Sequence, residues 1–146
     1  MAQVQPQRPE FDSLEVGQEV FESAKVIKRE DVKAYADASG DQNPLHQDDD
    51  YARSVGFPGI IAHGMFSMAH LTKSLKDWAG NPAALKSITV QFRAVVYMDE
   101  TLVAKGRVAS KNDSTREVTL DVWEEIERDG QTVTPIKNSQ AVVSLA

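Results

Sequence analysis

Apolar residues recur at helical spacing in two segments of the first half of the chain. In the first, Val32 and Ala36 share one face and Gly40 follows as a stop signal, so we expect a helix that begins near residue 29. In the second, from about residue 63 to residue 79, apolar side chains cover more than one face. Because a helix that is apolar nearly all round is usually buried, this segment is predicted to be a central, buried helix.

Alternation of apolar and polar residues predicts strands in other segments. The stretch from Glu19 to Val26 is one such strand, and the last third of the chain alternates in four further runs. Asn112-Asp113 and Asp129-Gly130 supply turns between antiparallel neighbours. Pro135 cannot donate to a strand ladder, so it indicates an edge or a bulge in the last run. The four later strands are centred on residues 88–94, 102–108, 118–122 and 133–145.

One buried helix and about five strands favour an α+β architecture in which an antiparallel sheet curls around the helix. The sheet has one apolar face to cover, and the helix needs cover on several sides. A single sheet also leaves two edges that a second copy can pair with, so we expect a dimer or a doubled unit. This arrangement is similar to the hotdog fold.

Residues 41–60 make a long connection rich in Asp, Asn, Pro and Gly, a composition typical of turns. Within it, residues 51–55 are predicted to form one helical turn. Loops of this length are uncommon in compact domains and are often functional. The connection is therefore the segment in which functional side chains are expected.

Length and composition exclude several classes of protein. The chain has 146 residues, 41% of them hydrophobic and 26% charged, which fits one globular domain. We expect residues 1–9 to be a flexible leader and residues 10–146 to be a single domain. The formal charge of -6 argues against binding to nucleic acid. The chain has no apolar stretch long enough to span a membrane, no apolar segment typical of a secretion signal and no cysteine, so we expect a cytoplasmic protein with no membrane partner.

Asp41 and His46 bracket an Asn43-Pro44 turn in the long connection. Pro44 fixes its own φ angle and biases Asn43 away from the helical region, so the turn can aim both side chains at one point. A water molecule held between a carboxylate and an imidazole is well placed for proton transfer. From the residues alone, the alternative that Asp41 caps the loop and His46 is a packed or surface histidine stays open.

His63 and Gly64 stand at the predicted start of the central helix. A helix N-terminus presents unpaired N–H groups and partial positive charge, and a glycine lets a ligand approach the backbone closely. A thioester carbonyl placed there would have its developing enolate oxygen stabilised. The alternative is that Gly64 relieves local crowding, and the residues alone do not decide between the two.

The three histidines do not predict a metal site. His63 and His70 are further apart in the sequence than zinc ligands usually are, and no carboxylate or thiolate is identified as a further ligand. The acidic run at residues 48–50 lacks the glycine and the terminal glutamate of a calcium loop. We therefore expect no bound metal, and we expect His63 to pack near the helix start and orient the loop.

The stretch Asp41-Gln42-Asn43-Pro44-Leu45-His46, followed by Ala62-His63-Gly64-Met65, resembles the MaoC-like dehydratases. The similarity extends from about Phe21 to the C-terminus. The family includes (R)-specific enoyl-CoA hydratases and (3R)-hydroxyacyl-carrier-protein dehydratase subunits. The resemblance implies a hotdog fold and a lyase that interconverts a trans-2-enoyl thioester and a (3R)-3-hydroxyacyl thioester in fatty-acid metabolism.

The resemblance also implies roles for individual residues. Asp41 and His46 would form the catalytic dyad, with His46 favoured as the base and the two titrating as a coupled pair. Gly64 would supply an oxyanion-hole N–H, and Asn43 would orient the dyad. Thr72 comes nine residues after His63, where some relatives carry a serine near the active site, so a hydroxyl is retained.

No cofactor is implied, because the substrate arrives activated as a CoA or acyl-carrier-protein thioester. A homodimer is expected, or a heterodimer with another hotdog subunit. Two other functions stay open: a hotdog acyl thioesterase, and a non-catalytic acyl-binding subunit of a heteromeric dehydratase. Thioesterases normally lack the paired motifs, and the dyad is degenerate in non-catalytic subunits, whereas Asp41 and His46 are both present here.

Overall fold

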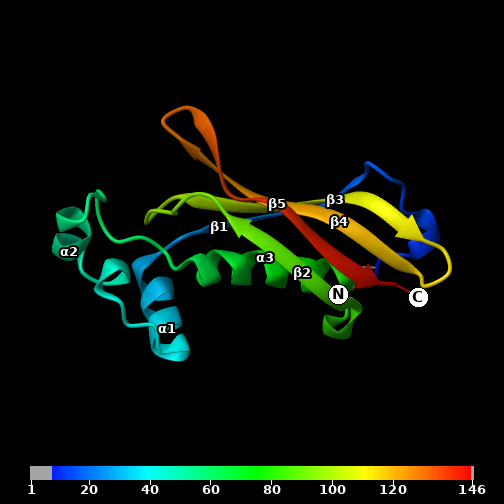
Figure 1. Ribbon diagram of the computed structural model, residues 1–146, viewed down its shortest axis with the longest axis horizontal. Coiled ribbons are helices and arrows are strands. Elements are labelled where there is room, and N and C mark those ends of the chain that lie inside the picture. The colour runs from blue at the N-terminus through cyan, green and yellow to red at the C-terminus, as the bar shows by residue number, and fades with distance from the viewer. Residues whose placement is uncertain (1–7, 146) are drawn as a thin grey trace, which may run out of the picture.

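The computed structural model describes residues 8–145, and in it the alternating segments pair into one five-stranded antiparallel sheet (Figure 1). The strand order is β1-β3-β4-β5-β2, so β1 and β2 form the two edges. The fold therefore agrees with the predicted α+β architecture. The strands are β1 (Glu19–Val26), β2 (Leu85–Phe92), β3 (Thr101–Asn112), β4 (Glu117–Arg128) and β5 (Gln131–Ser144).

Three α-helices and three short 3-10 turns connect the strands. Helix α3 lies along one face of the sheet, while α1 and α2 lie near one end of it (Figure 1). None of the described helices is long and apolar enough to cross a membrane. The helices are α1 (Arg29–Ser39), α2 (Asp49–Ser54) and α3 (Gly64–Ala79), and the 3-10 turns are η1 (Phe11–Ser13), η2 (Pro44–His46) and η3 (Pro82–Ala84).

The inner face of the sheet follows from alternation along its central strands. In β4 every second side chain is buried, and those of Val118, Leu120 and Val122 share an apolar cluster with Leu71 and Leu75 of α3. Burial of each such leucine contributes roughly 1.5–3 kcal/mol. The sheet and α3 therefore make one core, and this core holds the N-terminal end of α3 in place.

The prediction of a central, buried helix is confirmed for the side of α3 that packs on the sheet. The sheet covers only the side of α3 that carries Leu71 and Leu75. On the other side Met65 is 55% exposed. The reason is that one sheet offers one surface, so it leaves the opposite side of the helix partly exposed.

Most other predicted elements are confirmed, with shifted ends. The predicted first strand and the helix that begins near residue 29 match β1 and α1. Strands β3 and β4 extend beyond their predicted ranges at both ends, whereas β2 begins earlier than predicted and ends at Phe92, before the predicted end. The turn predicted at residues 51–55 is the six-residue helix α2, which begins at Asp49. Pro135 lies where the β4–β5 register shifts, in the interior strand β5, so it marks a bulge and not an edge. Apart from residues 8 and 9, the predicted leader lies outside the described residues.

The long connection is held to the rest of the fold by Asp49. One of its carboxylate oxygens accepts hydrogen bonds from the Arg29 guanidinium at 2.9 Å and from the Ile60 N–H at 3.0 Å, and the other accepts from Arg29 at 2.7 Å. The Arg29 hydrogen bond is the main cause that lowers the pKa of Asp49. These contacts tie the connection to α1 and close it just before α3 begins.

The inner face of the sheet carries one buried acid, Glu124 of β4. Its side chain is 0% exposed, and neither carboxylate oxygen has a hydrogen-bond partner among the described residues. Burial raises the pKa of Glu124 to about 9. The side chain is therefore a neutral carboxylic acid at pH 7, because burial removes water from the charged carboxylate and destabilises it relative to the protonated form.

Replacing Glu124 by glutamine is expected to flatten the pH dependence of folding stability. In the unfolded chain the carboxyl ionises near its ordinary pKa of 4.5, whereas in the folded protein it stays protonated up to about pH 9. The contribution of Glu124 to folding stability is therefore full below pH 4.5 and falls as the pH rises toward 9, by up to about 1.4 kcal/mol per pH unit. Thermal unfolding measured from mildly acidic to alkaline pH should give a steeper decline in Tm for the wild type than for Glu124→Gln. Parallel declines would contradict a neutral buried carboxyl.

Candidate active site

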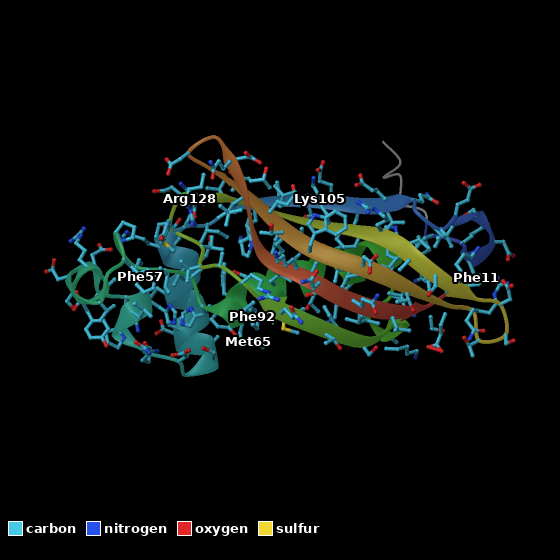
Figure 2. All side chains as sticks on the ribbon, turned by 45° about the horizontal axis from the view of Figure 1, so that its top comes forward. Phe11, Phe57, Met65, Phe92, Lys105 and Arg128 are labelled. Atoms are coloured by element: carbon cyan, nitrogen blue, oxygen red, sulfur yellow. The ribbon has the colours of Figure 1, made fainter. Side chains whose placement is uncertain are left out.

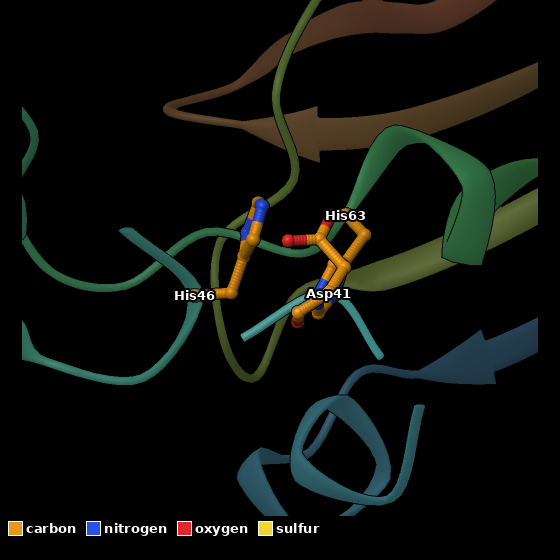
Figure 3. A group of neighbouring side chains, drawn as sticks. All are labelled: Asp41, His46 and His63. Atoms are coloured by element: carbon orange, nitrogen blue, oxygen red, sulfur yellow. The ribbon is translucent and has the colours of Figure 1, made fainter. Parts of the chain in front are cut away.

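The side chains of Asp41, His46 and His63 meet at the N-terminus of α3 (Figure 3). A carboxylate oxygen of Asp41 and ring nitrogens of His46 and His63 all lie within 4.8 Å of one another. Asp41 follows the end of α1, His46 ends η2, and His63 is the residue before α3. The structure thus brings together the pair that the sequence singled out.

Asp41 is positioned by the turn that follows α1. Gly40 ends that helix in the left-handed conformation, with φ of 80°, which a residue without Cβ adopts at little cost. The Asp41 N–H donates to the Ser39 hydroxyl oxygen at 3.2 Å, and the Asp41 carboxylate accepts from the Asn43 N–H at 3.2 Å. The side-chain oxygen of Asn43 then accepts from the Leu45 N–H at 3.0 Å and caps η2. Asn43 therefore connects the turn that holds Asp41 with the turn that carries His46.

The tautomer of His46 follows from its hydrogen bond to a carbonyl. Its Nδ1 lies 2.8 Å from the main-chain oxygen of Ile61. A carbonyl oxygen only accepts hydrogen bonds, so in the neutral ring Nδ1 carries the proton and Nε2 keeps a lone pair. His46 is half-buried and borders the cavity beside Asp41. The imidazole is thus oriented as a base whose free nitrogen is Nε2.

His63 supports this arrangement from the buried side. It is 2% exposed, its Nε2 donates to the Asp41 carbonyl at 3.2 Å, and its ring stacks on that of His46 with centroids 3.8 Å apart. The Tyr35 ring packs against it at 4.9 Å. Burial, followed by the nearby His46, lowers the pKa of His63, so this ring is neutral and positions the other two residues. Its Nδ1 is buried with no hydrogen-bond partner in the described part of the chain.

Gly64 opens α3 at the position where a backbone N–H has no partner within the helix. A Cβ at this residue would meet the ring of Phe92 at 3.4 Å, which is a tight but tolerable contact. The partial positive charge of the helix N-terminus adds to the exposed N–H. Gly64 therefore offers an unpaired backbone N–H as a hydrogen-bond donor beside the imidazole of His46.

Two cavities meet at His46, Gly64 and Phe92. The outer cavity, of about 380 Å³, reaches Asp41 and Tyr35. The inner cavity, of about 310 Å³, is bordered mainly by apolar side chains. A larger cavity of about 760 Å³ lies elsewhere, and no histidine lines it. The inner cavity is also lined by Ile61, Ala62, Ser67, Arg93, Ala94, Val95, Val96 and Pro135.

The Asp41, His46 and His63 cluster has the composition of a metal site, yet its geometry favours hydrogen bonding. One nitrogen of each ring is already bonded to a carbonyl oxygen. The two rings are stacked at an interplanar angle of 25°, so their remaining lone pairs do not converge on one point as metal ligands must. The cluster is better suited to hold water or a polar substrate.

Thr72 is not brought to this cluster. It lies about two turns further along α3, and its hydroxyl donates to the Met68 carbonyl at 2.9 Å. It lines neither of the two cavities. Its hydroxyl is occupied by the helix backbone, as is common for threonine inside helices.

Several residues of the site were not predicted. The Ile61 carbonyl, which sets the tautomer of His46, leaves no signal in a sequence because every residue has a carbonyl group. Tyr35 belongs to the periodic apolar face of α1 and could have been placed near the connection that follows it. Ser67 and Phe92 reach the site only through the packing of α3 against β2, which one sequence does not reveal.

The structure defines a small α+β domain with a carboxylate and two imidazoles gathered at a helix N-terminus, and the comparisons identify its family. The MaoC like domain model matches residues 13–128. The chain therefore belongs to the MaoC-like dehydratase family, and the resemblance noted from the paired motifs is confirmed.

The relatives agree in their named activities. The chain is 30% identical over 142 residues to the 3-hydroxybutyryl-CoA dehydratase of Methylorubrum extorquens, covering 93% of this chain and 89% of that protein. It is 30% identical over 126 residues to the (R)-specific enoyl-CoA hydratase of Rhodospirillum rubrum, covering 83% and 87%. The solved (R)-hydratase from A. caviae involved in PHA biosynthesis superposes with a TM-score of 0.81 at 25% identity, over 92% of this chain and 98% of that one. The hotdog fold is thereby confirmed.

Proposed function

We propose that this protein catalyses the reversible addition of water to a trans-2-enoyl thioester, giving a (3R)-3-hydroxyacyl thioester. The observation that carries the proposal is the His46 ring, whose Nδ1 is held by the Ile61 carbonyl, in one cavity with the Asp41 carboxylate and Gly64. The named activities of the relatives support the same reaction.

In the hydration direction His46 acts on water. Its Nε2 removes a proton as the water oxygen forms a bond to C3 of the enoyl group. The π electrons of the C2–C3 bond move toward the thioester and give an enolate. The Asp41 carboxylate stabilises the imidazolium that forms, because an opposite charge within about 5 Å favours the charged ring. His63 keeps the ring stacked in place during this step.

The reaction is completed by proton delivery to C2. The proton taken from water passes from the His46–Asp41 pair to C2, so the product contains all the atoms of one water molecule. Dehydration follows the same steps in reverse. Because the two side chains share the proton, they act as one coupled acid–base unit.

The Gly64 N–H and the positive end of α3 are placed to stabilise the enolate oxygen. The charge on this oxygen is larger in the transition state than in the bound thioester. The interaction therefore lowers the barrier more than it strengthens binding. The substrate brings its own activation as a CoA or acyl-carrier-protein thioester, and we propose that no further cofactor takes part.

We also propose that the protein forms a dimer through β2, with a second copy favoured over a different hotdog subunit. Strand β2 is a sheet edge, and its last residue, Phe92, is 48% exposed. Met65 of α3 lines the outer cavity together with Phe92, and both are labelled in Figure 2. Pairing along β2 would cover this apolar surface. Sedimentation would then give twice the chain mass of 16.1 kDa. A cytoplasmic location stays a prediction from the sequence.

The hydratase is tested by the loss of enoyl-thioester absorbance with crotonyl-CoA. Asp41→Asn and His46→Gln are each expected to lower kcat by about 10²- to 10⁴-fold, since each removes one half of the acid–base pair. Asp50→Asn, which changes an exposed carboxylate of α2, is the matched control and should retain wild-type turnover. A thioesterase would instead release free CoA thiol, and a non-catalytic subunit would show no change in either signal.

The role of the Gly64 N–H is tested by the pair Gly64→Ala and Gly64→Pro. Gly64 is the first residue of α3, and His63 before it has φ of -61° and ψ of 141°, so the backbone accepts proline here, which removes the N–H and adds three ring carbons. Alanine reports the effect of the added carbon against Phe92. We expect kcat of the proline variant to lie about 10²- to 10³-fold below that of the alanine variant. Equal kcat values, with both variants folded, would remove this N–H from the mechanism.

A further inference from the structure

The least exposed ion pair among residues 8–145 joins Arg128 to Glu100. Arg128 is the last residue of β4, and the two side chains are 23% and 14% exposed. The Arg128 Nε donates to one carboxylate oxygen of Glu100 at 2.9 Å, and its Nη2 donates to the other at 2.7 Å. This forked geometry fixes the orientation of both side chains, and partial burial protects the pair from screening by salt.

The pair holds the segment of residues 93–100, which connects β2 to β3. The Arg128 Nη2 also donates to the Val95 carbonyl at 3.0 Å, and the Tyr97 N–H donates to the Glu100 carboxylate at 2.7 Å. The Arg128 guanidinium lies 4.1 Å from the centroid of the Tyr97 ring, which is a cation–π contact. The segment is therefore held at a carbonyl group, at an N–H group and at a ring.

The same segment is bonded to the backbone that holds His46. The Ala62 N–H donates to the Val96 carbonyl at 2.9 Å, and Ile61 pairs with Tyr97 in an isolated β-bridge. The Ile61 carbonyl in turn accepts from the His46 Nδ1 at 2.8 Å. A series of hydrogen bonds, linked through single peptide units, therefore leads from the ion pair to the His46 ring.

The contacts of Arg128 are confined to this segment. Every hydrogen bond that its side chain makes within residues 8–145 goes to Val95 or Glu100. Residues 93–96 line the inner cavity together with His46 and Gly64, so the segment is also one wall of the site. Removal of the guanidinium therefore acts first on this wall and on the backbone bonded to it, while the apolar clusters of the core keep their own contacts.

We propose that Arg128 is a positioning residue of the site: together with Glu100 it fixes the segment of residues 93–97, and through Ile61 it sets the orientation and the tautomer of the His46 ring. Its effect on turnover rests on the proposed hydratase function, whereas its effect on the ring does not. A base displaced by about 1 Å can lose about 10²-fold in rate. Displacement of the Ile61 carbonyl also frees the ring to exchange between its two tautomers.

The kinetic test compares Arg128→Met with a matched arginine variant. Arg128→Met keeps an apolar stem and removes the fork, so we expect kcat for crotonyl-CoA to fall at least about tenfold while KM changes less than about threefold. Arg116→Met is the control. The Arg116 guanidinium also bonds a carboxylate, that of Asp12, at 3.1 Å, and lies 4.5 Å from the centroid of the Phe11 ring, at the opposite end of the molecule from Arg128 (Figure 2). This variant should keep the wild-type kcat, even where its Tm falls by the same amount.

The tautomer of His46 separates a positioning role from a general loss of stability. Long-range 15N–1H NMR of the folded proteins at mildly alkaline pH reports it without any substrate. In the wild type and in Arg116→Met we expect a His46 ring protonated on Nδ1. In Arg128→Met the shifts of the two ring nitrogens should move toward each other, which reports exchange between tautomers. Arg128→Lys keeps the charge without the fork, so it should give a smaller shift, and it serves as the test variant if Arg128→Met does not fold.

The two readouts distinguish failure of this inference from failure of the proposed function. A lower kcat together with an averaged His46 tautomer, in the Arg128 variants and not in Arg116→Met, supports the inference. Folded Arg128 variants whose His46 ring stays protonated on Nδ1 overturn it, whatever their kcat. A wild type that does not hydrate crotonyl-CoA, with the tautomer averaged only in the Arg128 variants, contradicts the proposed function and leaves the inference standing.

Discussion

The hydrogen bond from the His46 ring to the Ile61 carbonyl is the contact on which the site depends. It joins the beginning of the long connection to its end, so His46 is placed against the N-terminus of α3 instead of being left on a solvated loop. The same bond holds the proton on Nδ1 and leaves Nε2 free. His63 stacks on this ring and bonds the Asp41 carbonyl, so the orientation of His46 and the position of Asp41 are set together.

Two buried polar groups lower the stability of the folded chain, and the packing of α3 on the sheet offsets this cost. The His63 Nδ1 and the Glu124 carboxyl are buried without partners in the described part of the chain, and each such group costs roughly 1–3 kcal/mol. The apolar clusters around Leu71 and Ala62 offset this cost. His63 borders the proposed catalytic pair, and Glu124 lies in the same sheet row as Phe92. Local violations of good packing are typical of functional positions.

Much of this arrangement could be predicted from the sequence, because it depends on short-range signals. Periodicity placed α1, α3 and the strands, and the spacing of Asp41 and His46 around an Asn-Pro turn indicated the pair that the structure brings together. The sequence did not predict that one side of α3 is partly exposed, because the apolar content of a helix does not say whether the same chain covers each of its faces. Glu124 was missed as well: it is one polar residue at an apolar position of β4, and its complete burial appears only when α3 packs on the sheet.

The central claim is that the Ile61 carbonyl fixes the tautomer of the His46 ring and leaves Nε2 as the nitrogen with the free lone pair. Long-range 15N–1H NMR of the histidine side chains, at mildly alkaline pH and with assignments from His46→Gln and His70→Gln, reports the tautomer of each ring directly. The account predicts opposite tautomers for the two stacked rings, with the proton on Nδ1 of His46 and on Nε2 of His63. A His46 ring protonated on Nε2 would contradict the account, because its base would then be turned away from the substrate.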